Sequence, residues 1–162
     1  MDYEGAFAAS VDKVREEGRY RVFADLERRA GRFPHAVNHG EGPDEVVIWC
    51  SNDYLGQGQS ARVIASGMQA MATMGAGSGG TRNISGTHHL HVLLEEELAA
   101  LHEKPSALLF TSGYVSNSAT ISTIAKILPD CVIFSDALNH ASMIDGIRQS
   151  GCEKRVFRHN DV

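Results

Sequence analysis

The sequence predicts an α/β fold with a mostly parallel sheet, because strand and helix patterns alternate through its C-terminal half. Three short strands are expected, each followed or preceded by a helix with apolar residues at helical spacing. The expected elements are, in order, a strand at 107–110, a helix at about 116–128, a strand at 131–134, a helix at about 140–150 and a strand at 155–158. Such alternation favours parallel pairing through right-handed crossovers.

The N-terminal part is expected to add helices and one strand before this region. Two amphipathic helices are expected first, a loop and a strand follow, and two further helices flank a glycine-rich segment. These are helices at 3–16 and 20–30, a loop at 33–44, a strand at 45–50, a helix at 60–74, the glycine segment 75–86, and an apolar helix to about 102 that Thr87 would cap. We expect residues 1–55 to form an N-terminal segment and residues 56–162 the first part of the large domain.

Composition is typical of an ordinary soluble globular domain of 162 residues, with 43% hydrophobic and 22% charged residues. The formal net charge of −5 gives no electrostatic footprint for nucleic acid or an anionic membrane. The first ten residues, MDYEGAFAAS, show no signal or transit pattern, so a cytoplasmic location is expected. Three widely spaced cysteines predict neither a disulfide framework nor a zinc site; they are Cys50, Cys131 and Cys152.

Five of the twelve residues from Gly75 to Gly86, GAGSGGTRNISG, are glycine, which allows the backbone close to a ligand. Three of these glycines match the pattern GxGxxG, but a helix pattern precedes them where the dinucleotide fingerprint requires a strand. The dinucleotide interpretation is therefore rejected. A ligand-binding loop and a flexible connector both fit the segment.

Two turns at strand ends are candidate binding positions, because ligands gather outside the carboxyl ends of parallel strands. Ser112-Gly113-Tyr114 opens a helix, where free N–H groups attract a phosphate, although an ordinary turn has the same composition. His140, in the second turn (135–140), is suited to stacking on a planar ligand, donating a hydrogen bond or capping the helix. Asn139 before it is a good N-cap.

Other polar residues carry weaker signals. Arg21 lies beside the apolar face of the expected helix 20–30, where its guanidinium fits a carboxylate or is simply solvated. His88, His91 and Glu95 follow helical spacing, but they lack a second ligand segment, so no metal site is predicted. Asp53 and Asp136 are single carboxylates near turns and form no catalytic pair.

Four segments together resemble the 5-aminolevulinate synthases, a branch of the α-oxoamine synthases, which are pyridoxal-phosphate enzymes of fold type I. The segments are WCSNDYLG (49–56), GAGSGGTRNISGT (75–87), LNHASMIDGIR (138–148) and FRHND (157–161). The resemblance implies a three-layer α/β/α large domain, a homodimer with shared active sites, and pyridoxal 5′-phosphate as cofactor. It further implies condensation of glycine with succinyl-CoA to 5-aminolevulinate, CoA and CO2 in haem biosynthesis.

The resemblance also assigns roles to residues. His140 matches the catalytic histidine that stacks on the cofactor ring, and Ser112, Gly113 and Tyr114 match the phosphate-side turn. Arg21 matches the arginine that pairs with the succinyl carboxylate. The remaining substrate-binding matches are Asn52, Thr81, Asn83, Ile84, Ser135 and, on the CoA side, Lys154.

One departure from the family pattern concerns the Schiff-base lysine, which in the family lies in the second half of a chain of about 400 residues. None of the lysines here, Lys13, Lys104, Lys126 and Lys154, matches it. The sequence is therefore expected to be an N-terminal portion, inactive alone. The alternatives are a non-catalytic piece and a sister synthase of the 8-amino-7-oxononanoate or 2-amino-3-ketobutyrate type.

Overall fold

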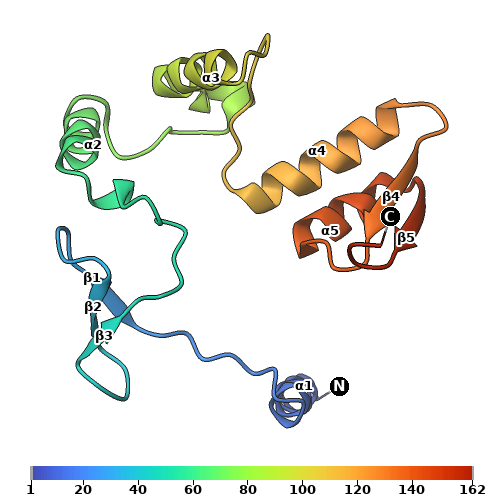
Figure 1. The fold of residues 1–162 in the computed structure, drawn as a ribbon, viewed down its shortest axis with the longest axis horizontal. Helices are drawn as coiled ribbons and strands as arrows, with labels where there is room; N and C mark the ends of the chain where they lie inside the picture. The colour runs from blue at the N-terminus through green and yellow to red at the C-terminus, as the bar shows by residue number, and fades with distance from the viewer. Residues whose placement is uncertain (1, 162) are drawn as a thin grey trace. The chain divides into compact units, whose positions relative to one another are not determined.

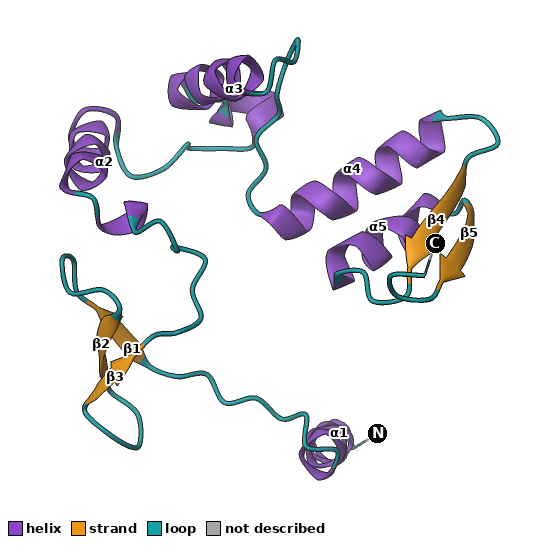
Figure 2. Cartoon of the chain, viewed as in Figure 1, coloured by secondary structure: helices purple, strands orange, loops and turns teal. Residues whose placement is uncertain are grey.

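The computed structural model describes residues 2–161 and divides between Ala76 and Gly77 into two compact units. The elements of both units are drawn in Figure 1 and coloured by type in Figure 2. Each unit is described by itself. The functional candidates are distributed over both.

The first unit contains a helix, a small antiparallel sheet and a second helix. Asp2 caps α1 (Tyr3–Glu16) by accepting the Gly5 N–H at 2.9 Å, which satisfies one of the free donors of the first turn. The sheet has the order β1-β2-β3 with antiparallel pairing throughout. Its strands are β1 (Leu26–Arg28), β2 (His35–Asn38) and β3 (Glu45–Val47), and η1 (Gln57–Gln59) and α2 (Ala61–Met74) follow.

Two expectations for this unit are wrong. The helix expected at 20–30 is absent: residues 19–25 are irregular, and 26–28 form β1 paired with 36–38. Nonlocal pairing overrides the local apolar spacing there. The loop expected at 33–44 contains β2 for the same reason. The strand expected at 45–50 is confirmed for 45–47, and the helix at 60–74 is confirmed as α2.

The second unit begins with the π-helical turn η2 (Arg82–Gly86) and the helix α3 (His89–Leu101). It continues with α4 (Gly113–Ile127), β4 (Val132–Asp136), α5 (Ala141–Ser150) and β5 (Glu153–Phe157). β4 and β5 pair in parallel, with Val132 opposite Glu153 and Asp136 opposite Phe157. The predicted strand–helix–strand unit with parallel pairing is therefore confirmed, and Figure 1 shows α4 and α5 side by side in orange and red.

Small residues let α4 and α5 pack closely. The buried positions of the two helices are Ser118, Ser122, Ala125, Ser142, Gly146, Ile147 and Ser150. A Cβ atom at Gly146 would lie 2.9 Å from the Ser118 carbonyl oxygen and 3.0 Å from the Ile121 Cβ. Ser118 Oγ also donates to Asp145 Oδ2 at 2.8 Å, so the interface is hydrogen-bonded as well as close.

Three expectations for the second unit need correction. Residues 107–110 are not a strand; their Leu109 N–H is bonded to the Glu95 carboxylate rather than to a neighbouring strand. His88, not Thr87, caps α3, and His140, not Asn139, caps α5. In both helices an imidazole Nδ1 accepts the first-turn N–H. The predicted helices to 102, at 116–128 and at 140–150 are confirmed within a few residues.

The described residues bury little apolar surface. Within residues 2–161, the buried apolar side chains are Ala36, Ala99, Ala125 and Ile147, whereas large ones such as Phe134 and Val156 are 68% and 63% exposed. Within residues 2–161, no helix has the length and hydrophobicity that a membrane span requires.

Candidate functional site

The N-terminus of α4 forms an open turn. Ser112 caps the helix, and its Oγ accepts the Val115 N–H at 3.2 Å. The N–H groups of Gly113 and Tyr114 belong to the first turn, whose donors have no partner within the helix. Gly113 has no atom within 4 Å of the position that a Cβ would occupy, so the backbone is accessible from that side. Such an open first turn suits an anionic group.

His140 lies at the N-terminus of α5 and faces the same turn. Its ring and the Tyr114 ring are 6.2 Å apart between centroids and meet edge to face at 71°. Nδ1 of His140 lies 3.2 Å from the Ser142 N–H and 2.7 Å from Ser142 Oγ. The structure thus brings Ser112, Gly113, Tyr114 and His140 together at the start of two adjacent helices.

Ser135 and Asp136 end β4 next to this cluster. Ser135 is buried, and its Oγ accepts from Asn139 Nδ2 at 3.0 Å, so Asn139 supports the turn rather than capping α5. Asp136 Oδ1 accepts the Leu138 N–H at 2.7 Å and lies 3.0 Å from His159 Nδ1. These bonds, the Leu138 N–H above all, lower the pKa of Asp136 below its usual value.

Lys154 lies on β5 opposite Ile133 of β4. Together with Ser135 and Arg148 it lines a hollow of about 170 Å³ at the end of α5. Two cations, the Asp136 carboxylate and a buried hydroxyl therefore share one surface depression, whose net charge is positive. This arrangement suits a ligand that carries negative charge.

The glycine-rich segment has a defined structure between Thr81 and Gly86. Thr81 Oγ1 donates to Asn83 Oδ1 at 2.7 Å, and the N–H groups of 84–86 turn back to the Thr81 carbonyl. Gly86 is buried directly against the backbone of Gly80, where no Cβ fits. Ile84, in contrast, is 83% exposed. The turn thus presents its predicted substrate residues to solvent.

An ion pair that the sequence analysis missed fixes this turn to the rest of the unit. Arg82 donates to Glu95 with both terminal guanidinium nitrogens, Nη1 and Nη2, at 2.5 and 3.0 Å, and Nη1 also donates to the Leu109 carbonyl at 3.3 Å. The Leu109 N–H donates to Glu95 Oε1 at 2.7 Å. Arg82 first and this N–H second lower the pKa of Glu95 to about 2. Glu95 and Leu109 lie 13 and 27 positions after Arg82 in the sequence, so no local periodicity could have predicted these bonds.

His88 and His91, which follow helical spacing with Glu95, bind each other. His88 and His91 form a reciprocal capping box at the start of α3, with the His88 N–H donating to His91 Nδ1 at 3.1 Å. Glu95 is held by Arg82 as described above. Within residues 2–161, no three His, Cys, Asp or Glu side chains are arranged to hold a metal ion.

Arg21 and Asn52 lie in the first unit, and both are exposed. Arg21 belongs to the irregular segment 19–25, so its expected place beside a helix face is wrong. Asn52 precedes Asp53, which accepts the Gly58 N–H at 3.0 Å and orders the turn before α2. The cluster at α4 and α5 belongs to the second unit.

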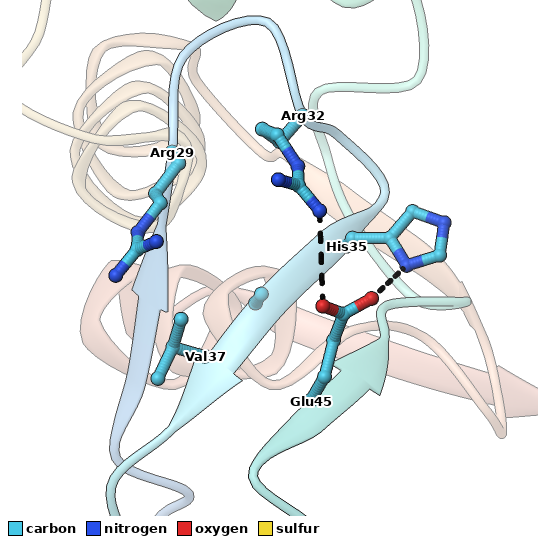
Figure 3. Close-up of a pocket in the computed structure, with 6 residues that line it drawn as sticks. Arg29, Arg32, His35, Val37 and Glu45 are labelled. Carbon is cyan, nitrogen blue, oxygen red and sulfur yellow. Dashed lines mark hydrogen bonds and ion pairs between the residues drawn. The ribbon is translucent and has the colours of Figure 1, made fainter.

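A small pocket in the first unit contains none of the predicted site residues. Figure 3 shows Glu45 between Arg32 and His35, at 3.8 and 2.9 Å, with Arg29 on the neighbouring strand end. Arg29 is itself paired with Glu27 at 2.9 Å. Each charged side chain of this pocket of about 60 Å³ therefore already has an ion-pair partner, and the pocket is a poor candidate for a ligand site.

Comparisons with known proteins point to one group of enzymes. The chain is 62% identical over 163 residues to 5-aminolevulinate synthase from Bradyrhizobium diazoefficiens, covering 100% of this chain and 40% of the relative. It is 58% identical to 5-aminolevulinate synthase 2 from Cereibacter sphaeroides, over 99% of this chain and 40% of that relative. The chain thus spans about 40% of the length of these relatives. The resemblance noted from the four motifs is confirmed.

Solved structures agree on the fold. A serine palmitoyltransferase from S. paucimobilis with a bound PLP–myriocin aldimine is 30% identical with a TM-score of 0.77, over 96% of this chain and 39% of that one. The 8-amino-7-oxononanoate synthase from Francisella tularensis is 25% identical with a TM-score of 0.52, over 68% and 30%. The predicted α/β fold, the beginning of a fold type I large domain, is therefore confirmed.

A family model, aminotransferase class I and II, matches residues 44–162, which include every element of the second unit and the cluster at α4 and α5. Accordingly, the chain belongs to the aminotransferase class I and II family.

Proposed function

We propose that this chain forms the N-terminal part of the catalytic machinery of a 5-aminolevulinate synthase. The reaction condenses glycine with succinyl-CoA and yields 5-aminolevulinate, CoA and CO2. The observation that carries the proposal is the meeting of the open α4 N-terminus with the imidazole of His140, 6.2 Å between the Tyr114 and His140 ring centroids. High identity to 5-aminolevulinate synthases over the whole chain supports the same reaction.

The residues present at this cluster fit pyridoxal 5′-phosphate. The first turn of α4 offers backbone N–H groups and, at Gly113, free space for a phosphate. His140 offers a flat ring at the adjoining helix start, suited to one face of a pyridine. When bound, the cofactor would supply the electron sink that stabilises the glycine carbanion. The protein residues then hold the ring and its phosphate in one orientation.

The substrate residues divide by chemistry. The forked guanidinium of Arg21 suits the far carboxylate of a succinyl group and would orient the thioester carbon. Thr81, Asn83 and Ile84 form an exposed turn that suits a pocket wall around the acyl chain. Asn52 and Ser135 are proposed as further polar contacts. Lys154, together with Arg148, suits the phosphates of CoA.

A chimera tests this function directly. The chain would replace the aligned 163 residues of the Bradyrhizobium diazoefficiens relative, which supplies the remaining part of the enzyme. We expect the purified chimera to form 5-aminolevulinate from glycine and succinyl-CoA. An inactive but folded chimera, or one that prefers a monocarboxylic acyl-CoA, would contradict the proposal, the latter in favour of a sister synthase.

Two substitutions in the chimera separate the proposed roles. Arg21→Leu should raise the KM for succinyl-CoA strongly and leave the KM for glycine unchanged, because only the acyl substrate carries the distal carboxylate. Unchanged succinyl-CoA kinetics would remove Arg21 from its role. His140→Ala should weaken cofactor binding and alter its visible absorption, whereas an unaltered spectrum would leave His140 only the capping role.

A second candidate function, a non-catalytic piece that contributes surface to a larger assembly, is favoured by the exposed apolar side chains. Phe134, Val156 and Ile127 are each more than 60% exposed, which is unusual for a self-contained domain. We propose that these surfaces are covered in a homodimer with shared sites. Gel filtration of the chimera would reveal a monomer if the dimer is wrong.

We also propose that residues 1–55 and 56–162 form the two parts of the chain, and that the protein is cytoplasmic.

A further inference from the structure

We propose that Ser142 and Asn117 are positioning residues that fix His140 as the neutral tautomer with its proton on Nε2. Neither residue belongs to the proposed binding set. The relevance of this tautomer to catalysis depends on the proposed function, but the tautomer itself can be measured without any ligand.

The first step of the argument concerns the backbone of α5. The Ser142 N–H lies 3.2 Å from Nδ1 of His140 and donates to it, as first-turn amides do to a capping side chain. A backbone N–H is only a donor, so Nδ1 must accept. Nδ1 therefore carries no proton, and in the neutral ring the proton is on Nε2.

The second step concerns the Ser142 hydroxyl, which lies 2.7 Å from the same Nδ1. Because Nδ1 accepts, Ser142 Oγ–H must donate to it. The lone pairs of Oγ are then free to accept, and Asn117 Nδ2 donates to Oγ at 3.0 Å. The result is a directed chain of hydrogen bonds from Asn117 through Ser142 to His140, in which the single lone pair of Nδ1 is shared between the Ser142 hydroxyl at 2.7 Å and the Ser142 N–H at 3.2 Å.

Reversing the chain leaves a buried group without a partner. If Nδ1 carried the proton, it would donate to Oγ, and the Ser142 N–H would lose its acceptor. Ser142 is fully buried, at 0% exposure, so water could not replace that acceptor. An unsatisfied buried N–H costs about 1–3 kcal/mol in general. The arrangement with Nδ1 unprotonated is therefore preferred.

This chain also determines what His140 presents to a ligand. Nδ1 is occupied inside the α4–α5 junction, so Nε2–H is the polar atom of the ring that remains for a ligand acceptor. The orientation of the ring plane follows from the same contacts, since Ser142 holds Nδ1 with both its N–H and its hydroxyl. Asn117 on α4 thereby couples the ring on α5 to the helix that begins at Gly113.

Another histidine in the same unit provides an internal reference of opposite polarity. His159 Nδ1 lies 3.0 Å from Asp136 Oδ1, a carboxylate that only accepts, and its Nε2 lies 3.1 Å from Asn160 Nδ2. The same reasoning therefore gives His159 its proton on Nδ1. The two histidines should show opposite patterns in one spectrum.

The experiment is long-range ¹H–¹⁵N correlation NMR of the ¹⁵N-labelled chain without ligand, near neutral pH. We expect a single Nε2–H pattern for His140, with Nδ1 in the range of an unprotonated nitrogen, and the reverse for His159. A proton on Nδ1 of His140, or averaging between both tautomers, would overturn the proposal.

A substitution that reverses the polarity sharpens the test. In Asn117→Asp the new carboxylate only accepts, so Ser142 Oγ–H should donate to it, and Oγ should then accept a hydrogen bond from a protonated Nδ1 of His140. We expect His140 to change from Nε2–H to a majority with Nδ1 protonated. Ser116→Asp places the same charge one residue away in α4, at a side chain that makes no hydrogen bond to Ser142 in residues 2–161, and should leave the wild-type pattern. If the two folded variants gave the same His140 pattern, the proposed chain of hydrogen bonds from Asn117 through Ser142 to His140 would be contradicted.

Discussion

Gly146 is the residue on which the approach of α4 to α5 depends most directly, and Gly146→Ala is the perturbation whose size follows most clearly from the structure. The added methyl group would lie 2.9 Å from the Ser118 carbonyl oxygen, 3.0 Å from the Ile121 Cβ and 3.1 Å from the Ser118 Cα. Two of these atoms are backbone of α4, so only a shift of the whole helix relieves the contact. Overpacking of this kind costs about 1–3 kcal/mol.

A second effect has the opposite sign. Replacing a helical glycine with alanine stabilises the helix by about 0.8–1.0 kcal/mol when the side chain is unobstructed. Subtracting this gain from the middle of the overpacking range, about 2 kcal/mol, leaves a net destabilisation of about 1 kcal/mol for the α4–α5 pair. That corresponds to a fall of about 5-fold in the protection of α5 amides from hydrogen exchange.

The assay is native-state hydrogen exchange followed by NMR, which reports each helix separately. Gly67→Ala in α2 is the matched control, because no atom lies within 4 Å of its Cβ position and α2 should gain protection. The reasoning is refuted if Gly146→Ala leaves α5 as protected as the wild type, or more so. A shifted Tyr114–His140 contact in the same spectra would show that the close packing also positions the site.

Three further predictions follow from individual contacts. Because the pKa of Glu95 is lowered from 4.5 to about 2, its stabilisation is complete above pH 4.5 and is lost as the pH falls towards 2. Hydrogen exchange of the Leu109 amide should lose protection as the pH falls from 4.5 to about 2, and Glu95→Gln should abolish this loss. If Glu95→Gln shows the same pH dependence as the wild type, the role of the ion pair is contradicted. The pKa of the Cys131 thiol is raised, chiefly by burial, so a thiol reagent at neutral pH should modify the exposed Cys50 faster than Cys131. Equal modification rates for the two cysteines would contradict this prediction. Asp136→Asn should move the Leu138, His159 and Asn160 NMR signals together, since all three bind one carboxylate, and a change confined to His159 would disprove that shared role.

The regular part of the second unit could be predicted from the sequence because its signals are local. Apolar spacing identifies α3, α4 and α5, and the alternation of strands and helices predicts the parallel pair β4 and β5. The turns at 112–114 and 135–140 follow from the same pattern. Their meeting through the Tyr114 and His140 rings depends on small buried residues, which apolar periodicity overlooks.

The features that escaped prediction depend on partners distant in sequence. β1 and β2 exist because 26–28 pairs with 36–38, whereas the apolar spacing of 20–30 favours a helix when considered alone. The expected strand at 107–110 finds no strand partner among residues 2–161, and Glu95 takes its amide instead. The N-caps His88 and His140 were not predicted because Ser, Thr, Asn and Asp are the usual N-cap residues.

The central claim, that the adjoining starts of α4 and α5 hold a phosphorylated pyridine, is tested most directly by titrating the ¹⁵N-labelled chain with pyridoxamine 5′-phosphate. This probe lacks the aldehyde and so cannot form imines with surface lysines. We predict saturable shifts at the Ser112, Gly113 and Tyr114 amides and at the His140 ring, which inorganic phosphate reproduces only at the amides. Shifts centred on the Arg29–Glu45 pocket, or none at 112–114 and 140, would contradict the claim.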